Sequence, residues 1–211
     1  MTRFHRSGSC SRTRPMTDTS PRRLIIGISG ASGVIYGVRM LELLRQTDVE
    51  THLVMSKSAE MTLAYETDLK PKEVKELATV TYPSTDIGAA ISSGSFKTMG
   101  MVIVPCSIRT MSEIATGVTA SLVSRAADVV LKERRRLVLA LRETPLHGGH
   151  LRTATTLADI GAIVAPLVPA FYQRPQTVDD IVNHSVGRLL DLFGIDVKVV
   201  KRWQGGGETE A

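Results

Sequence analysis

The sequence contains little cysteine, few aromatic residues and no long apolar run. Its two cysteines, Cys10 and Cys106, are too few for a disulfide framework or a four-cysteine zinc site. No stretch reaches the ~18 consecutive apolar residues that are needed to cross a bilayer. Aromatic residues form 4% of the chain and none alternates with a lysine or arginine run, which argues against a stacking surface for nucleic acid. We therefore expect a protein of a reducing compartment, the cytoplasm, with no structural metal, membrane span or nucleic-acid partner.

The positive charge of the chain is concentrated at its N-terminus. The 211 residues carry a formal net charge of +5. Residues 1–20 hold +3 of this charge through four arginines and one aspartate, Arg3, Arg6, Arg12, Arg14 and Asp18. Residues 1–22 have no apolar periodicity, so we expect a disordered basic tail. One interpretation of this tail is an organelle transit peptide. The interpretation that we favour is that the given sequence begins at an upstream start codon and that Met16 is the true initiator.

Short apolar runs alternate with helical patterns between residues 23 and 204. Strands are expected at Leu24–Ser29, Glu50–Ser56, Ala78–Tyr82, Met101–Pro105, Arg136–Leu141 and Ala162–Leu167. Helices are expected at Val34–Gln46, Lys57–Glu66, Thr110–Thr116, Ser121–Glu133, His150–Ile160 and Val178–Phe193. The last helix has a capping box at Thr177 and Asp180 and a stop at Gly194. The alternation predicts one doubly wound α/β domain, a mostly parallel sheet in a three-layer α/β/α sandwich of Rossmann or flavodoxin type, and a flexible tail at 205–211.

The first strand–helix junction is a turn of small residues, Gly27–Gly33. Backbone N–H groups at such a turn, at the positive end of a helix dipole, suit a phosphate. The turn is neither a Walker A loop nor a Gly-x-Gly-x-x-Gly motif, and by itself it is explained equally well as a tight turn that needs small residues. Two serines within it, Ser29 and Ser32, favour contact with a ligand.

A second polar cluster, Pro105–Thr110, follows the fourth expected strand. Doubly wound folds bind ligands at the carboxyl ends of strands near the switch point, so Ser107, Thr110 and nearby helix amides are candidates to hold part of the same ligand. Cys106 is more simply explained as a small buried hydrophobic residue than as a nucleophile, since no histidine lies beside it in the sequence.

Basic residues gather in the C-terminal half of the chain. Arg125 and Lys132–Arg136 surround a helix end, Arg142-Glu143 ends a buried strand, and Arg188 lies on the last helix. Each has a simple interpretation as a solvated cap or a surface side chain. His147 and His150 are two potential metal ligands without a third, so we expect ordinary loop side chains there.

The motifs, taken in order, closely resemble the flavin prenyltransferases, the UbiX family. The elements that carry the resemblance are Gly27–Gly33, Ser56-Lys57, Glu66-Thr67, Pro105–Ser107, Arg125–Asp128, Leu131–Arg135, Arg142–Pro145, Phe171-Tyr172 and Arg202-Trp203. The resemblance covers residues 23–203 and implies the transfer of a dimethylallyl group from dimethylallyl monophosphate to N5 and C6 of reduced FMN. The product, prenylated FMN, would serve a separate decarboxylase. The resemblance also implies a homododecamer with active sites at subunit contacts.

The resemblance implies roles for individual residues. FMN is expected to contact Gly30, Ala31, Ser32, Ser56, Ser107, Ile108, Arg109, Thr110 and Arg125. The donor is expected to contact Lys132, Arg142, Tyr172, Arg188 and Trp203. Catalytic roles are expected for Ser32, Glu66 and Glu143. Arg109 departs from the family pattern in a variable loop. No metal is expected, because arginine, lysine and tyrosine side chains can stabilise a phosphate leaving group.

Two other functions compete with this interpretation. One alternative is a related FMN-dependent decarboxylase that acts on cysteine-type substrates. Those enzymes carry a Pro-Ala-Ser-Ala-Asn-Thr pattern, and the matching segment of this chain, Pro105–Thr110, lacks its asparagine. A non-catalytic FMN-binding electron carrier is the other alternative. It would have no use for a second phosphate site.

Overall fold

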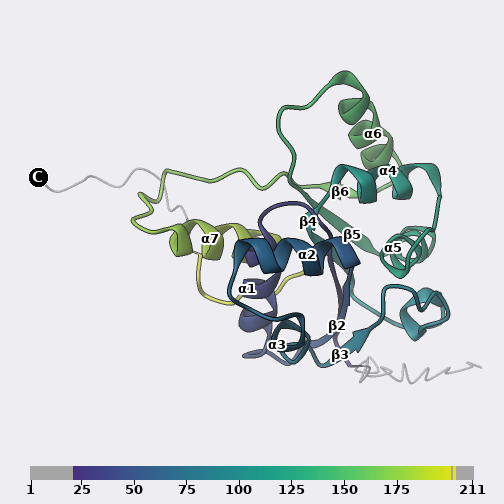
Figure 1. The fold of residues 1–211 in the computed structure, drawn as a ribbon, viewed down its shortest axis with the longest axis horizontal. Helices are drawn as coiled ribbons and strands as arrows, with labels where there is room; N and C mark the ends of the chain where they lie inside the picture. The colour runs from purple at the N-terminus through teal and green to yellow at the C-terminus, as the bar shows by residue number, and fades with distance from the viewer. Residues whose placement is uncertain (1–20, 201, 203–211) are drawn as a thin grey trace, which may run out of the picture.

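The computed structural model describes residues 21–200 and residue 202, which form one parallel sheet flanked by helices (Figure 1). The strands are β1 (Arg23–Ile28), β2 (Glu50–Met55), β3 (Val80–Tyr82), β4 (Gly100–Cys106), β5 (Arg136–Leu141) and β6 (Ile163–Val164). The helices are α1 (Val34–Leu44), α2 (Lys57–Glu66), α3 (Pro71–Lys75), α4 (Ile108–Thr116), α5 (Leu122–Lys132), α6 (Gly148–Asp159) and α7 (Val178–Asp191), with a 3₁₀ turn η1 (Ala90–Ser92). Within these residues, no helix has both the length and the apolar character required to cross a membrane.

The strand order β3-β2-β1-β4-β5-β6 confirms the doubly wound arrangement expected from the sequence. The chain builds outward from β1 through β2 to β3, and then restarts beside β1 with β4. All pairings are parallel, so the carboxyl ends of the strands lie at one edge of the sheet. The direction of winding reverses between β1 and β4, and their carboxyl ends open the crevice where such folds bind ligands.

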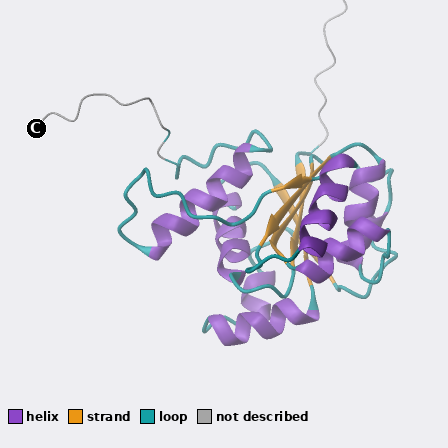
Figure 2. Cartoon of the chain, turned by 90° about the horizontal axis from the view of Figure 1, so that it is seen from above, coloured by secondary structure: helices purple, strands orange, loops and turns teal. Residues whose placement is uncertain are grey.

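The sheet separates two apolar cores, and Figure 2 shows helices on both of its faces. Along β1, Leu24 and Ile26 pack with α1 and α7, whereas Ile25 packs with α4 and α5 on the other face. The same alternation runs along β5, where Val138 and Leu139 face opposite cores. Burial on both faces explains why these strands read as continuous apolar runs.

Most expected elements agree with the structure, with differences at element ends. The bounds of α2 and β5 are as expected, and the Thr177–Asp180 capping box of α7 is confirmed. Helix α4 begins at Ile108, two residues before the prediction, because Ser107 caps it. Strand β6 is reduced to Ile163–Val164, and α3 was not predicted. The predicted tails lie outside the described residues apart from residues 21 and 22, as does Trp203.

Candidate active site

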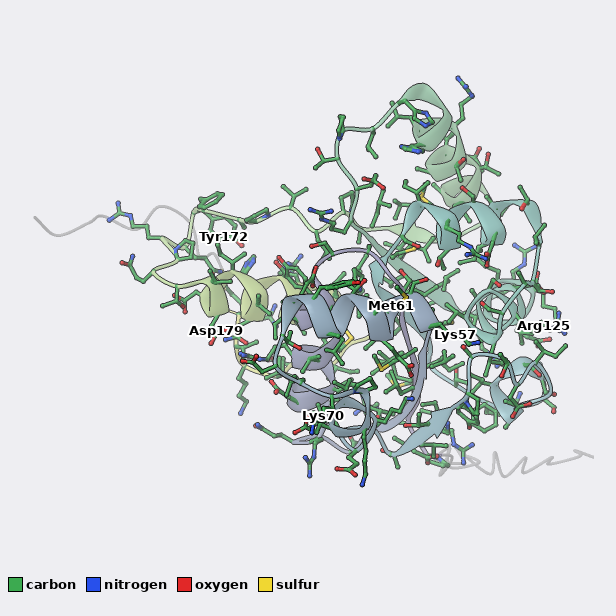
Figure 3. The ribbon with its side chains drawn as sticks, in the orientation of Figure 1. Lys57, Met61, Lys70, Arg125, Tyr172 and Asp179 are labelled. Carbon is green, nitrogen blue, oxygen red and sulfur yellow. The ribbon has the colours of Figure 1, made fainter. Side chains whose placement is uncertain are left out.

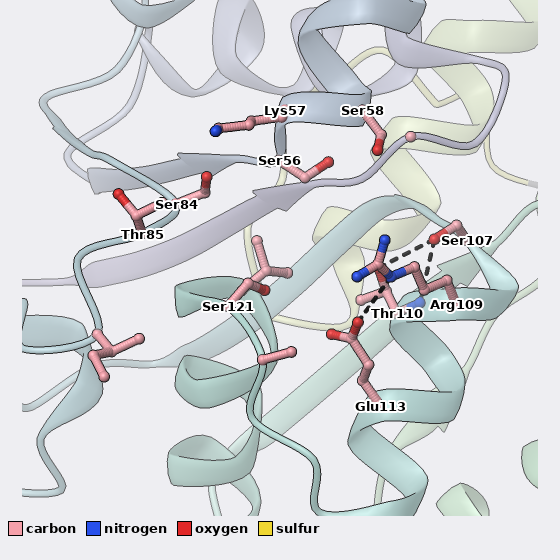
Figure 4. A pocket seen from close by; sticks show the side chains of 14 residues that line it. Ser56, Lys57, Ser58, Ser84, Thr85, Ser107, Arg109, Thr110, Glu113 and Ser121 are labelled. Carbon is pink, nitrogen blue, oxygen red and sulfur yellow. Dashed lines mark hydrogen bonds and ion pairs between the residues drawn. The ribbon is translucent and has the colours of Figure 1, made fainter.

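A cavity of ≈ 570 Å³ lies beyond the carboxyl ends of the strands (Figure 4). Its walls come from the beginnings of α2, α4 and α5 and from the loop after β3. Seven hydroxyl side chains line it: Ser56, Ser58, Ser84, Thr85, Ser107, Thr110 and Ser121. The volume falls within the range of ~300–1,000 Å³ that is usual for small-molecule and cofactor sites.

Three helix N-termini meet at this cavity, and a serine caps each of them. The Ser56 side chain accepts a hydrogen bond from the Ala59 amide at the start of α2. Ser107 and Ser121 cap α4 and α5 in the same way. Each cap leaves the first amides of its helix without an intrahelical partner and the positive end of the dipole toward the cavity. The arrangement suits an anion such as a phosphate.

Two cationic side chains lie beside these N-termini. Arg109 of α4 pairs with Glu113, with 3.0 Å between Nε and Oε1. Lys57 is the first residue of α2, and no hydrogen-bond or ion-pair partner of its ammonium group is found among the described residues. A cation at the start of a helix opposes the helix dipole, so an anion between Lys57 and the amides would stabilise this end of α2. Figure 3 shows Lys57 at this end of the helix.

The turn after β1 differs from what the sequence predicted, because a carboxylate from the chain itself caps α1. The Gly33 amide donates to Glu66 Oε2 at 2.9 Å, and the Val34 amide donates to the same oxygen at 3.0 Å. Glu66 therefore occupies the Gly33 and Val34 amides, for which the sequence predicted a phosphate, while the contact of Gly30, Ala31 and Ser32 with FMN stays a prediction. Ser29 is buried, and its hydroxyl donates to the Pro105 carbonyl and accepts from the Ser107 amide, so it joins β1 to β4 rather than facing a ligand.

Two glycines of this turn are required by geometry. Gly33 has φ +96°, a left-handed conformation that L side chains rarely adopt. Gly30 lies so close to α2 that a Cβ atom there would be 2.4 Å from the Ser58 Cβ. The close approach brings Gly30 into the wall of the cavity.

Five of the nine residues expected to contact FMN line the cavity: Gly30, Ser56, Ser107, Arg109 and Thr110. The other four, Ala31, Ser32, Ile108 and Arg125, lie outside its lining. Ile108 packs against the core on the α4 face, and Arg125 forms an ion pair with Asp128 at 2.9 Å. Ser32 is exposed on the turn that follows β1.

Sequence reasoning missed part of the wall, including Lys57, Ser58, Ser84, Thr85 and Ser121. Ser121 could have been found from the sequence as the cap of α5, since serine is a common helix cap. Lys57 could have been found because it directly follows Ser56, which was predicted. Ser84 and Thr85, the second and third residues after β3, carry no pattern of their own. They reach the cavity because the sheet places β3 next to β2.

Three of the residues expected to bind the donor gather around α7. The Tyr172 hydroxyl lies 3.2 Å from Nε2 of His184, and Figure 3 shows Tyr172 beside this helix. Burial lowers the pKa of His184, and the nearby Arg188 lowers it further. Burial raises the pKa of Tyr36 on α1, and the nearby Arg142, which follows β5, opposes this rise, as does Ser185 of α7.

Lys132 does not join this group within one chain. It ends α5, next to the amino end of β5, and its ammonium bonds to Glu133 at 2.6 Å. Arg142 follows the carboxyl end of the same strand, so the six residues of β5, about 20 Å at the usual rise per residue, separate the two. Helix α5 runs back from the carboxyl edge of the sheet, and its end therefore faces away from the cavity.

The remaining predictions concern a carboxylate, a thiol and two histidines. Glu143 is exposed and accepts from the adjacent Thr144 amide at 3.1 Å. Burial raises the pKa of Cys106 to about 12, so this thiol is not a nucleophile at neutral pH. Among the described residues, no three or more side chains form a group that could bind a metal ion, and this holds for the surroundings of His147 and His150.

Comparisons with known proteins agree with this geometry. A family model described as Flavoprotein matches residues 12–190. Flavin prenyltransferase UbiX of Escherichia coli K12 is 60% identical over 187 residues, which cover 87% of this chain and 99% of that protein. A UbiX crystal structure in complex with FMN and dimethylallyl pyrophosphate has a TM-score of 0.88 and 47% sequence identity, and the match covers 89% of this chain and 100% of that one. A dodecameric FMN-dependent UbiX-like decarboxylase from E. coli O157:H7 has a TM-score of 0.85 and 49% identity, covering 87% and 100%. The chain belongs to the Flavoprotein family and, within it, to the UbiX flavin prenyltransferases.

Proposed function

We propose that this protein is a flavin prenyltransferase that transfers a dimethylallyl group from dimethylallyl monophosphate to reduced FMN. The new bonds join the prenyl group to N5 and C6 of the flavin, and prenylated FMN passes to a partner decarboxylase. The observation that carries the proposal is the presence of two separate basic regions in a chain 60% identical to a UbiX enzyme. One region suits the FMN phosphate and the other suits the donor phosphate.

FMN occupies the cavity, with its phosphate among the three helix N-termini. Lys57 neutralises phosphate charge, and the hydroxyl groups of Ser56 and Ser107 surround the sugar-like chain. Arg125 and the exposed turn at Ala31 and Ser32 extend the site beyond the cavity, toward the reacting part of the flavin.

The donor phosphate binds to Arg142, Tyr172 and Arg188. Charge accumulates on this phosphate as its bond to the allyl carbon breaks, and fixed cations stabilise it without a metal ion. Lys132 and Trp203 complete the donor site in our proposal. Because Lys132 lies at the opposite sheet edge of its own chain, it reaches a donor site only from a neighbouring copy, in a homododecamer like the E. coli O157:H7 relative.

Proton transfer falls to Glu66, Glu143 and Ser32. Protons must leave N5 and C6 as the new bonds form, and a carboxylate or the released phosphate can accept them. Two backbone amides fix the Glu66 carboxylate beside the Ser32 turn, which holds it in one orientation.

The test is anaerobic incubation of the full chain with reduced FMN and dimethylallyl monophosphate, followed by mass analysis of the flavin. A mass gain of one prenyl unit is expected, with and without EDTA. The pyrophosphate donor, present in the related crystal structure, is the parallel sample. Unchanged FMN bound to folded protein would instead favour an electron carrier.

We also propose that the enzyme works in the cytoplasm. Its flavin substrate is needed in the reduced form, which a reducing compartment maintains. Fractionation of the native cells and detection of the protein would test this location.

A further inference from the structure

A polar network outside the proposed active site connects β2 with the end of β3. His52 is 2% exposed, and its Nε2 lies 2.9 Å from Oε1 of Glu50. Its Nδ1 lies 2.9 Å from the Tyr82 hydroxyl. Arg23 of β1 bonds to the same Glu50 oxygen at 3.3 Å, and the Phe96 ring meets the imidazole edge-on. The imidazole therefore has a polar partner at each nitrogen and aromatic neighbours around it.

The chemistry of the partners fixes where the protons lie. A carboxylate accepts hydrogen bonds and donates none, so Nε2 of His52 carries the hydrogen in the contact with Glu50. Burial lowers the pKa of His52, as does the nearby Arg23, although Glu50 opposes both effects. The neutral ring leaves Nδ1 as an acceptor, and the Tyr82 hydroxyl donates to it. Burial also raises the pKa of Tyr82, so this hydroxyl keeps its proton.

Tyr82 is the last residue of β3, a three-residue strand at the edge of the sheet that pairs with β2. In the register, Tyr82 lies opposite Val54 and is a diagonal neighbour of His52, within reach of an aromatic side chain. The loop that follows, residues 83–88, contributes Ser84, Thr85 and Ile87 to the cavity wall. We call residues 83–88 the wall loop.

Hydrogen bonds within the wall loop, such as that from the Asp86 amide to the Pro83 carbonyl, shape its turns, but few contacts tie it to the rest of the described residues. The Leu122 amide of α5 donates to the Ser84 carbonyl at 2.9 Å, and Ala89 is buried at the far end of the loop. The side chain of Ile87 is 62% exposed. At the other end of the loop, β3 pairs with β2 over three residues only. The hydrogen bond between Tyr82 and the buried His52 adds a second attachment to β2.

We propose that His52 is a positioning residue that holds the wall loop in place through Tyr82 and thereby sets the affinity for FMN. This proposal rests on the proposed function, because FMN is the ligand of the cavity. Neither side chain lines the cavity, so their effect on the flavin is transmitted through the loop.

The experiment compares Tyr82→Phe, His52→Leu and His52→Gln with a matched control, Thr81→Val. Thr81 lies on the same strand, and its hydroxyl donates to the Lys75 carbonyl, away from the cavity. Leucine lacks both polar functions of the imidazole, whereas glutamine supplies one donor and one acceptor. Two quantities are measured: FMN affinity of each full-length protein, and hydrogen–deuterium exchange of residues 83–88 without flavin.

Loss of one buried hydrogen bond predicts about 5- to 10-fold weaker FMN binding by Tyr82→Phe, with faster exchange of the wall loop. His52→Leu should weaken binding at least as much, and His52→Gln should recover part of the loss. The KM for FMN should rise while kcat and the KM for the donor stay unchanged, and Thr81→Val should bind FMN within 2-fold of wild type. Wild-type FMN affinity and loop exchange in Tyr82→Phe would overturn the proposal, even if His52→Leu fails to fold. Absence of FMN binding by the wild type would instead refute the proposed function, and the exchange measurement would still test the loop anchor.

Discussion

The cavity proposed for FMN and the donor region proposed around α7 are separate parts of the molecule, and their charges are arranged differently. In the cavity, the ammonium of Lys57 has no partner among the described residues, and three helix N-termini face the same space. Around α7, Arg188 is paired with Asp191 at 2.6 Å, and Lys132 is paired with Glu133 in a distant part of the same chain. Lys57 is thus available to an anion in the cavity, where the other cation, Arg109, is paired with Glu113. In the region proposed for the donor, Arg188 and Lys132 must exchange internal ion pairs for contacts to the ligand.

This difference separates flavin binding from donor use, and variants should affect one without the other. The largest effect is expected for Glu66→Gln, which lowers the rate of prenyl transfer by roughly 100-fold or more if the carboxylate moves a proton. Glutamine keeps one oxygen for the amides of Gly33 and Val34, so FMN affinity and the thermal midpoint should change little. Single-turnover mass analysis and flavin titration measure the two quantities. An equal loss of FMN affinity would make Glu66 a structural cap.

Tyr172→Phe and Arg188→Ala address the donor region directly. We expect donor use to fall by roughly 10-fold to 1000-fold, the range for loss of one group that stabilises developing charge. The spectrum and affinity of FMN should stay nearly unchanged, because both residues lie by α7 and away from the cavity lining. Arg45→Ala, an exposed arginine beyond the end of α1, is the matched control. Loss of FMN with normal donor kinetics per bound flavin would contradict the two-region assignment.

Lys57→Met tests the other region, the cavity proposed for FMN. Removing a charged hydrogen-bond partner of the phosphate should weaken FMN binding by roughly 10- to 100-fold, more so at low salt. Turnover at saturating FMN should be preserved. Lys72→Met is the control, since Lys72 of α3 is exposed and pairs at 3.7 Å with Glu76, the residue that follows this helix. If both substitutions change FMN affinity equally, Lys57 has no specific role.

A smaller effect on stability is expected from Asp191, which bonds to both Arg202 and Arg188. These partners, Arg202 first, lower the pKa of Asp191 below its ordinary value of 3.8. A carboxyl whose folded pKa is lowered stabilises the fold above 3.8 and loses this contribution as the pH falls through the folded value. We expect the loss to be about 0.5–1 kcal/mol, since the arginines are half exposed. Denaturant unfolding at several pH values measures it, and Asp191→Asn should lack this part of the acid dependence.

The smallest effect is expected from deletion of residues 1–20. This segment has no apolar periodicity to contribute to a core, so the thermal midpoint and FMN affinity should equal those of the full chain. A clear drop in the midpoint would show that the segment supports the fold and would refute the domain bounds predicted from the sequence.

Much of the fold follows from local sequence signals. Continuous apolar runs such as Leu24–Ile26 predict strands covered on both faces, and a serine or threonine before an apolar helix marks where it begins. These signals depend on neighbouring residues, which is why α2 and α7 start where they were expected. Strand β6 and helix α3 are too short to carry a periodic pattern, so their bounds were not predictable in this way.

The candidate site was predicted less completely, because its parts come from several strand ends. The sequence by itself determined the order of elements, the helix caps and the chemical character of each cluster, since these depend on residues close together in the chain. Tertiary structure decided which clusters meet. Gly33 and Glu66 are 33 positions apart and share hydrogen bonds, whereas Lys132 and Arg142 are ten positions apart and lie at opposite edges of the sheet. Parallel strands bring their carboxyl ends together, and each returning helix carries its own end to the other edge, so separation along the chain does not determine separation in space.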